Sequence, residues 1–255
     1  MRYIIRLSYL GSDFCGWQIQ TRFRSVQETI QNALSTLLKE EIQIVGAGRT
    51  DSGVNAINYI AHFDTSTDFQ PELLTCKLNA MLPKSLIIHE ISQTTPEFHA
   101  RFDAKSREYH YFIHRKKDPF MDNFSYLCRY PLDIDAINES CTYLLGTHDF
   151  SCFEKTGGNN KTSICTITEA KISTWIPPHV SALGYDAQEG DYLVFTIKAD
   201  RFLRNMVRAI VGTMIDIGRG RHKPEWIEEL IATGKRSDAG SSVPGHPLFF
   251  TDVAY

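Results

Sequence analysis

The six cysteines of this 255-residue chain form no C-x-x-C pair and lie scattered along it. We therefore expect neither a disulfide framework nor a zinc site, and the pattern favours a reducing, cytoplasmic location. The sequence also lacks any apolar stretch near the ~20 residues that span a membrane. Arginines interrupt the apolar run at the N-terminus, MRYIIRL, so we predict neither a signal peptide nor membrane association.

A strong charge of either sign is missing too, since the formal net charge is −3. Taken alone, this argues mildly against a nucleic-acid partner. Phosphate contacts act only within about a Debye length, however, so the distribution of charge matters more than the sum. Basic residues cluster at 105–117, 201–208 and 219–223. Each cluster alone is compatible with a solvated face, and together they leave an RNA-binding surface open.

The first part of the chain shows a regular order of hydrophobic patterns. Residues 2–9 alternate as a half-buried strand, and Ser25-x-x-Glu28 is a capping box before an amphipathic helix at 26–38. The same reasoning predicts further elements, namely strands at 42–45, 56–63 and 86–91 and a helix at 74–82 that Pro83 stops. The predicted order is βαββαβ.

The second part repeats this order with one extra helix. The patterns predict strands at 107–114, 164–173, 192–199 and 248–255, helices at 134–145, 203–217 and 224–232, and a long surface loop at 175–191. Gly146 would follow the first of these helices as its C′ residue. We therefore predict an α+β fold with two ferredoxin-like, RRM-like halves, residues 1–103 and 104–255, whose antiparallel sheets meet around a central basic cleft.

The segment 46–54, GAGRTDSGV, stands between two predicted strands and is the strongest candidate for chemistry. Its glycines permit positive φ and close approach of a ligand. Arg49 and Asp51 can pair if the turn folds back, and a neighbouring arginine keeps a carboxylate ionised. An ionised aspartate serves as a nucleophile or a base. The alternative is a tight turn with a surface ion pair. A dinucleotide fingerprint would need glycine at 51, and the P-loop sequence Gly-Lys-Ser/Thr is absent.

The run GAGRTDSGVNA closely resembles the signature of the A-type tRNA pseudouridine synthases. Further blocks match that family in the same order: YLGSDFCGWQIQ (9–20), SVQETIQNAL (25–34), LNAMLP (78–83), FHARFDAKSREYHYFI (98–113), GTHDFSCF (146–153) and FLRNMVRAIVG (202–212). The resemblance covers essentially the whole chain.

This resemblance implies a cofactor-free isomerase that turns uridine into pseudouridine at positions 38–40 of the tRNA anticodon arm after base flipping. It implies that Asp51 is the catalytic nucleophile, that Arg49 holds the flipped phosphate or orients Asp51, and that Arg208 reaches the catalytic aspartate. Tyr109 would stack on the extruded uracil. It further implies a homodimer that contacts the anticodon arm and the elbow of tRNA. Periodicity alone would make Tyr109 a buried sheet residue and Arg208 a snorkelling helix residue.

Several points stay open in the sequence. Asp51 can attack C1′ of the ribose, attack C6 of the base, or remove a proton from C2′ to give a glycal. The family usually has histidine where this chain has Asn55, and the C-terminus and the loop at 175–191 also depart from the family pattern. A tRNA-binding protein without activity and a synthase for another RNA are the competing interpretations. His148-Asp149 lacks further ligands at suitable spacing, so we expect no metal.

Overall fold

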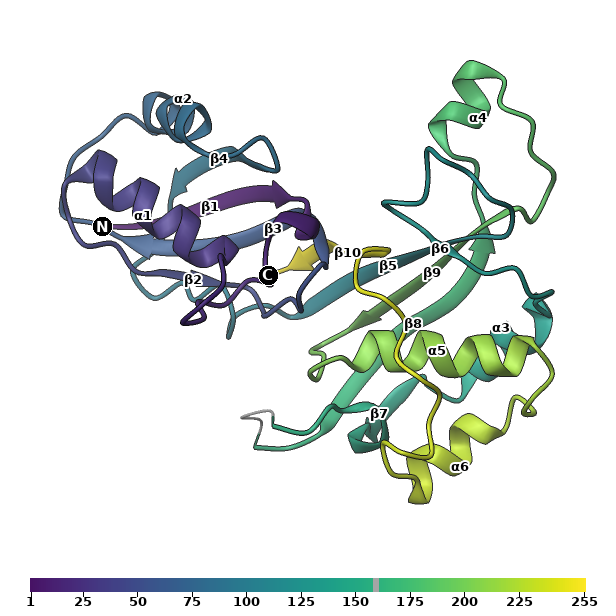
Figure 1. Ribbon diagram of the computed structural model, residues 1–255. Coiled ribbons are helices and arrows are strands. Elements are labelled where there is room, and N and C mark those ends of the chain that lie inside the picture. Colours follow the sequence, from purple (N-terminus) through teal and green to yellow (C-terminus); the bar gives the residue numbers. More distant parts are fainter. Residues whose placement is uncertain (158–160) are drawn as a thin grey trace. The chain divides into compact units, whose positions relative to one another are not determined.

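The computed structural model describes residues 1–157 and 161–255, which form two compact units (Figure 1). The first unit comprises Met1–Ser106 together with Phe249–Tyr255, and the second comprises Arg107–Leu248. These units differ from the predicted halves, 1–103 and 104–255, chiefly in the last strand. Strands and helices occur in both, so the α+β class is confirmed. The ferredoxin-like arrangement of the halves stays a prediction.

The first unit follows the predicted order of elements. They are β1 (Arg2–Tyr9), α1 (Val26–Leu38), β2 (Ile44–Gly46), β3 (Asn55–Asp64), α2 (Pro71–Met81) and β4 (Leu86–Gln93), joined by β10 (Leu248–Ala254). The strands β4, β1 and β3 lie side by side and antiparallel. β2 and β10 both pair with the other edge of β3. β2 pairs antiparallel with the end of β3, and β10 pairs parallel with the start of β3.

The core of the first unit follows from the patterns in β1 and α1. Alternate residues of β1, from Tyr3 to Tyr9, are buried, while those between them are less so. Ser25 caps α1, because its side chain accepts a hydrogen bond from the backbone N of Glu28 at 3.2 Å. The helices α1 and α2 contact each other, and α2 packs along β4. The alternation seen in the sequence therefore decides which face of this sheet is covered.

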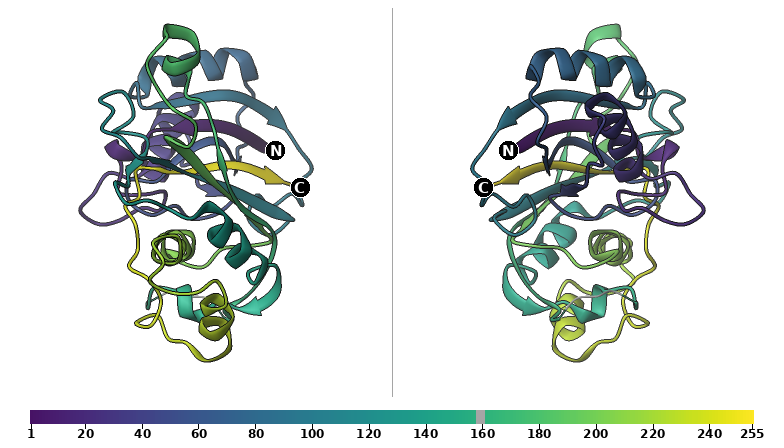
Figure 2. Two further views of the ribbon diagram at one scale, coloured as in Figure 1. Left: turned by 90° about the vertical axis from the view of Figure 1, so that its right-hand side faces the viewer. Right: turned by 90° about the vertical axis from the view of Figure 1, so that its left-hand side faces the viewer.

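The second unit contains a longer series of elements. They are β5 (Ser106–His114), β6 (Tyr126–Leu127), α3 (Ile134–Thr142), β7 (Gly146–Asp149), β8 (Ile164–Thr174), α4 (Pro178–Leu183), β9 (Tyr192–Ala199), α5 (Met206–Gly218) and α6 (Trp226–Thr233). The sheet order is β5-β9-β8-β7, with antiparallel neighbours, and β6 runs parallel to β5. Nearly every residue of α5 is buried, and α5 lies beside α3, as the end-on views in Figure 2 show.

In each unit, an asparagine on a helix makes hydrogen bonds with the backbone of a strand. The side chain of Asn79 in α2 bonds both the N and the O of Ile88 in β4, each at 2.8 Å. Asn138 in α3 does the same to Ile172 in β8, at 2.9 and 3.1 Å. Backbone groups at a strand edge are open to pairing with other chains, so these amides protect the sheets.

The structure corrects three local predictions in the second unit. Gly146 is not a helix cap, because α3 ends at Thr142 and Gly146, at φ +100°, begins β7. α5 starts at Met206 and not at 203, because Asn205 before it is left-handed at φ +64°. The predicted loop at 175–191 contains the short helix α4. None of the helices in the described ranges is long and apolar enough to cross a membrane.

Candidate active site

The loop between β2 and β3 carries Arg49 and Asp51, and backbone hydrogen bonds hold it at both ends. Ala47 N donates to the O of Ile60 in β3 at 2.8 Å. At the other end Val54 N donates to Asp51 O at 3.1 Å, and Gly53 takes φ +79°. The tight turn therefore begins at Asp51, with glycine at the position that needs a positive φ.

Thr50, which precedes Asp51, is anchored through both its backbone and its side chain. Its hydroxyl lies 2.9 Å from the hydroxyl of Tyr9 at the end of β1. Its carbonyl accepts a hydrogen bond from the N of Trp17 at 3.2 Å. Thr50 is only 8 % exposed, while Asp51 is half-buried. The backbone that carries the Asp51 carboxylate is thus fixed at the residue before it.

The segment 9–17 packs so closely on this loop that two positions admit only glycine. A Cβ atom at Gly11 would lie 2.3 Å from the O of Val54. At Gly16 it would lie 2.4 Å from the O of Thr50, and Gly16 also has φ +86°. Backbone atoms cannot give way cheaply at such distances. Two sequence blocks that are separate along the chain, 9–20 and 46–56, therefore form one structure.

Asn55, the departure from the family pattern, is part of this contact. It is 3 % exposed, and its side-chain Oδ1 accepts a hydrogen bond from the N of Gly11 at 2.7 Å. Tyr59 also fixes the loop to β3, because its hydroxyl donates to the O of Gly48 and accepts from Gly48 N at 3.3 Å. Sequence reasoning did not identify the supporting roles of Tyr9, Thr50 and Tyr59. Only the resemblance of block 9–20 to the family pointed to this region.

The pairing of Arg49 with Asp51 stays a prediction. Arg49 is exposed on the loop. The turn of this segment runs from Asp51 to Val54, and the anchored Thr50 stands between Arg49 and Asp51.

Tyr109 and Arg208 lie in the second unit. Tyr109 belongs to β5, pairs in register with Ile197 of β9, is 7 % exposed and meets the ring of Phe202 edge-on at 5.1 Å. Arg208 belongs to α5 and is half-buried, and its Nε donates to the O of Val243 at 2.7 Å. Val243 N donates in return to Arg208 O at 3.2 Å. The arginine is therefore held against the segment after α6.

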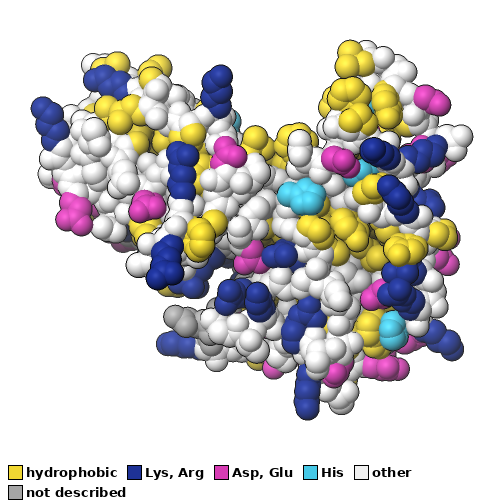
Figure 3. All heavy atoms as spheres, in the orientation of Figure 1, with side chains coloured by type: hydrophobic (Ala, Val, Ile, Leu, Met, Phe, Trp, Pro, Cys, Tyr) yellow, Lys and Arg dark blue, Asp and Glu magenta, His cyan; other side chains and the backbone are white. Residues whose placement is uncertain are grey.

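The basic clusters are partly compensated by acidic neighbours. In the first cluster Lys116 pairs with the Asp191 carboxylate at 2.9 Å, and Arg107 is buried and donates to the backbone O of Asp200 at 2.6 Å. In the last cluster Asp216 pairs with Arg221 at 2.8 Å. Lys and Arg side chains are nevertheless spread widely over the visible surface (Figure 3). The clusters are thus not three uninterrupted basic faces.

His148 and Asp149, the pair considered for a metal, have local structural contacts. His148 Nε2 lies 2.8 Å from the O of Leu145, and Asp149 accepts from Ser151 N at 2.9 Å. Within residues 1–157 and 161–255, no three His, Cys, Asp or Glu side chains are grouped to hold a metal. The pair therefore organises the end of β7.

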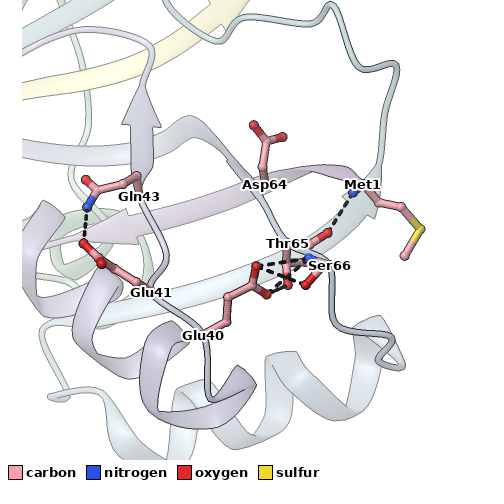
Figure 4. Close-up of a pocket in the computed structure, with 7 residues that line it drawn as sticks. All are labelled: Met1, Glu40, Glu41, Gln43, Asp64, Thr65 and Ser66. Carbon is pink, nitrogen blue, oxygen red and sulfur yellow. Dashed lines mark hydrogen bonds between the residues drawn. The ribbon is translucent and has the colours of Figure 1, made fainter.

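A pocket in the first unit lies far from the Asp51 loop. It is lined by residues around the N-terminus and the far end of β3: Met1, Glu40, Glu41, Gln43, Asp64, Thr65 and Ser66 (Figure 4). The hydroxyl of Thr65, 2.6 Å away, and groups of Ser66 and Thr67 bond the Glu40 carboxylate and lower its pKa. The ten residues of β3 separate this pocket from the end of the loop that carries Asp51 by about 30 Å at about 3.3 Å per residue. We therefore place the candidate site at the loop.

Comparison with known proteins gives one consistent result. A family model described as tRNA pseudouridine synthase matches residues 6–103 and 141–255. The tRNA pseudouridine synthase A of Parabacteroides distasonis is 46 % identical over 255 residues, which cover 100 % of this chain and 96 % of that protein. The proteins of the same name from Porphyromonas gingivalis and Colwellia psychrerythraea are 42 % and 35 % identical, each over 100 % of this chain.

The chain with this α+β fold is accordingly an RNA-modifying isomerase. The chain belongs to the tRNA pseudouridine synthase family, and its relatives carry the name tRNA pseudouridine synthase A. Members of this family isomerise uridine to pseudouridine in tRNA.

Proposed function

We propose that this isomerase acts on uridines 38–40 on the 3′ side of the tRNA anticodon arm, with Asp51 as the catalytic nucleophile. The observation that carries the proposal is the fixed backbone at Thr50, which presents the half-buried Asp51 carboxylate at the end of a braced loop. A catalytic group held by a rigid scaffold loses little freedom on reaching the reactive geometry. The full-length similarity to tRNA pseudouridine synthases supports the substrate class.

The reaction exchanges one bond for another within the same nucleotide. The N1–C1′ bond breaks, the uracil turns, and a C5–C1′ bond forms, while the base loses a proton at C5 and gains one at N1. No electrons are lost or gained overall. Asp51 attacks C1′, attacks C6, or removes a proton from C2′, and each route requires the carboxylate to be ionised.

Three further residues receive roles from the family resemblance. Arg49, exposed on the same loop, contacts the phosphate of the flipped nucleotide. Arg208 acts on the catalytic aspartate, and Tyr109 stacks on the extruded uracil. The edge-on contact with Phe202 and the bond to Val243 give Tyr109 and Arg208 defined orientations within their own unit.

The resemblance also supports a cytoplasmic homodimer that contacts both the anticodon arm and the elbow of tRNA. Sedimentation velocity of the purified protein, with and without tRNA, tests this assembly. A species with the mass of two chains is expected without tRNA, and a heavier complex of two chains with bound tRNA is expected in its presence. A protein that stays monomeric at micromolar concentration contradicts it.

The decisive experiment is a pseudouridine map of unmodified tRNA treated with wild type, Asp51→Ala and Asp68→Ala, without added cofactor. Asp68 is an exposed carboxylate of the same unit, so its variant controls for lost charge. We expect pseudouridine at 38–40 with wild type and Asp68→Ala and none with Asp51→Ala. Modification only at other uridines would refute the target. Activity retained in Asp51→Ala would refute the nucleophile.

The order of chemical steps is tested with substrate labelled by deuterium at C2′ of the target uridine. The glycal route breaks the C2′–H bond, so it predicts a primary isotope effect on single-turnover rates. Attack at C1′ or C6 leaves that bond intact and predicts a rate close to that of unlabelled tRNA. Either result removes at least one of the three routes.

A further inference from the structure

A short hairpin at residues 20–24 lies beside the Asp51 loop and exposes an aromatic ring between two arginines. Gln20 and Phe23 form an isolated bridge, with Thr21 and Arg22 at the turn. Phe23 is 58 % exposed, and both arginines are exposed as well. A single exposed apolar side chain is common on protein surfaces, but this one lies between two arginines and beside the Asp51 loop.

The hairpin is fixed to the segment that braces the catalytic loop. Cys15 N donates to the O of Arg24 at 2.9 Å, and Gln20 Nε2 donates to the O of Cys15 at 2.8 Å. The guanidinium of Arg24 also lies over the ring of the buried Phe14, 5.3 Å from its centroid. The tip is therefore anchored by its base, and Phe23 is presented to solvent from a defined support.

The same segment places the hairpin close to Asp51. A Cβ at Gly16 would lie 3.1 Å from the carbonyl carbon of Asp51, and Gly16 follows Cys15 directly. Successive Cα atoms are about 3.8 Å apart, so Arg24 lies within about 10 Å of the Asp51 backbone. Stacked bases repeat about every 3.4 Å along a strand. A nucleotide within about three positions of a uridine at Asp51 can thus reach this tip.

We propose that the hairpin is an RNA contact, in which Phe23 stacks on an unpaired base within about three nucleotides of the reacting uridine. Arg22 and Arg24 bind the adjoining phosphates. This rests on the proposed role of Asp51. The chemistry is that of single-stranded nucleic-acid recognition, in which aromatic rings supply stacking faces for bases and cations follow the backbone. An unpaired base is required, because a base within a duplex already has two stacking neighbours.

The first test measures binding of unmodified tRNA to Phe23→Ala, Phe23→Leu and Phe23→Trp. Stacking on an aromatic ring predicts about 5- to 100-fold weaker binding for Phe23→Ala and for Phe23→Leu, and restored binding for Phe23→Trp. Phe102→Ala is the matched control. Phe102 is 74 % exposed, also has an arginine over its ring, and lies three residues after His99, whose ring meets that of His62 edge-on near the far end of β3. We expect the control to bind within twofold of wild type.

The second test places the contact on the RNA. A photoreactive phenylalanine at position 23 is cross-linked to tRNA, and the linked nucleotide is mapped by primer extension. A cross-link to an unpaired nucleotide within about three positions of the modified uridine supports the proposal. A cross-link confined to base-paired nucleotides overturns it, as does normal binding by Phe23→Leu or Phe23→Ala.

Charge at the tip is tested separately with Arg22→Gln. Loss of one phosphate contact lowers the slope of log affinity against log salt by about 0.7 to 1. An unchanged slope removes the role assigned to Arg22. Because these tests read binding and position, they stand apart from the pseudouridine map. Asp51→Ala can fail to modify tRNA and still bind it through Phe23. Asp51→Ala can also remain active, which would refute the role of Asp51, while the Phe23 variants still bind tRNA more weakly.

Discussion

The hydrogen bond between Tyr9 and Thr50 offers a direct measure of how much the braced loop matters. The two hydroxyls are 2.9 Å apart, and both residues are buried, at 3 % and 8 % exposure. Tyr9→Phe and Thr50→Val each remove one hydroxyl and with it this hydrogen bond. An intramolecular hydrogen bond contributes about 0.5–1.5 kcal/mol net, so each single variant should lose about that much free energy of unfolding. For a protein of this size, we expect Tm to fall by about 2–4 °C per kcal/mol.

The double variant Tyr9→Phe/Thr50→Val removes both hydroxyls at once. We expect it to lose less stability than the sum of the single variants, with a coupling of about 1 kcal/mol. Activity should respond differently from stability. Neither side chain is assigned a substrate contact, and a displacement of about 1 Å in a catalytic group can cost about 100-fold in rate. We therefore expect kcat to fall at least tenfold in all three variants, with KM within about twofold.

The assay combines urea unfolding with steady-state pseudouridine formation at a temperature where every variant is folded. Tyr3→Phe is the control, since Tyr3 lies on the same buried face at the other end of β1 and its hydroxyl has only a weak contact with Met1 Sδ, at 3.8 Å. It should change neither kcat nor KM. Strict additivity of the stability losses, together with unchanged kcat in the double variant, would refute the brace.

Two further predictions concern titration in the folded chain. The Asp118 carboxylate is buried, which acts to raise its pKa, but hydrogen bonds from Tyr192 at 2.6 Å, Phe120 N at 2.9 Å and His179 at 2.7 Å outweigh burial and leave the pKa lowered. A carboxyl whose pKa is lower in the folded than in the unfolded chain stabilises the folded state at pH values above its ordinary pKa of about 4. This contribution is lost as the pH falls through the folded pKa. Asp118→Asn should therefore be less stable than wild type at pH 7 by about 1.5–3 kcal/mol, with the gap narrowing in urea unfolding as pH falls below about 4; a constant gap would contradict this. Burial raises the pKa of the thiols of Cys141, Cys152 and Cys165 to about 12, whereas Cys76 is exposed, so iodoacetamide should label Cys76 first by mass spectrometry. Equal labelling of a buried thiol in folded protein would show that it is accessible.

Local patterns in the sequence predicted most of the elements. The alternation of Tyr3 to Tyr9 predicted β1, and Ser25 with Glu28 predicted the start of α1, because a cap bond and a period of two need only neighbouring residues. The short strands β6 and β7 and the helix α4 were missed. Elements of two to six residues carry too little periodicity to be seen, and they form because their neighbours are already in place.

Part of the candidate site could likewise be predicted from the sequence, and part of it could not. The proposal of the loop at 46–54 and of Asp51 as the reactive group came from the sequence, because the run of glycines with Arg49, Thr50 and Asp51 is contiguous and resembles one family. The position of the turn could not be predicted, since it depends on the anchors of Thr50, and those come from elsewhere in the chain.

The sequence by itself determined the family, the order of elements and the residue to which chemistry is assigned. The tertiary structure alone decided what fixes that residue. Tyr9, Gly11 and Gly16 precede Asp51 by more than thirty residues, and no local pattern connects them to it. Only the pairing of β1 with β3 places the segment 9–17 on the loop, and there Asn55, an unexplained departure in the sequence, accepts the Gly11 hydrogen bond. Contacts between distant segments arise from packing, which no single window of sequence contains.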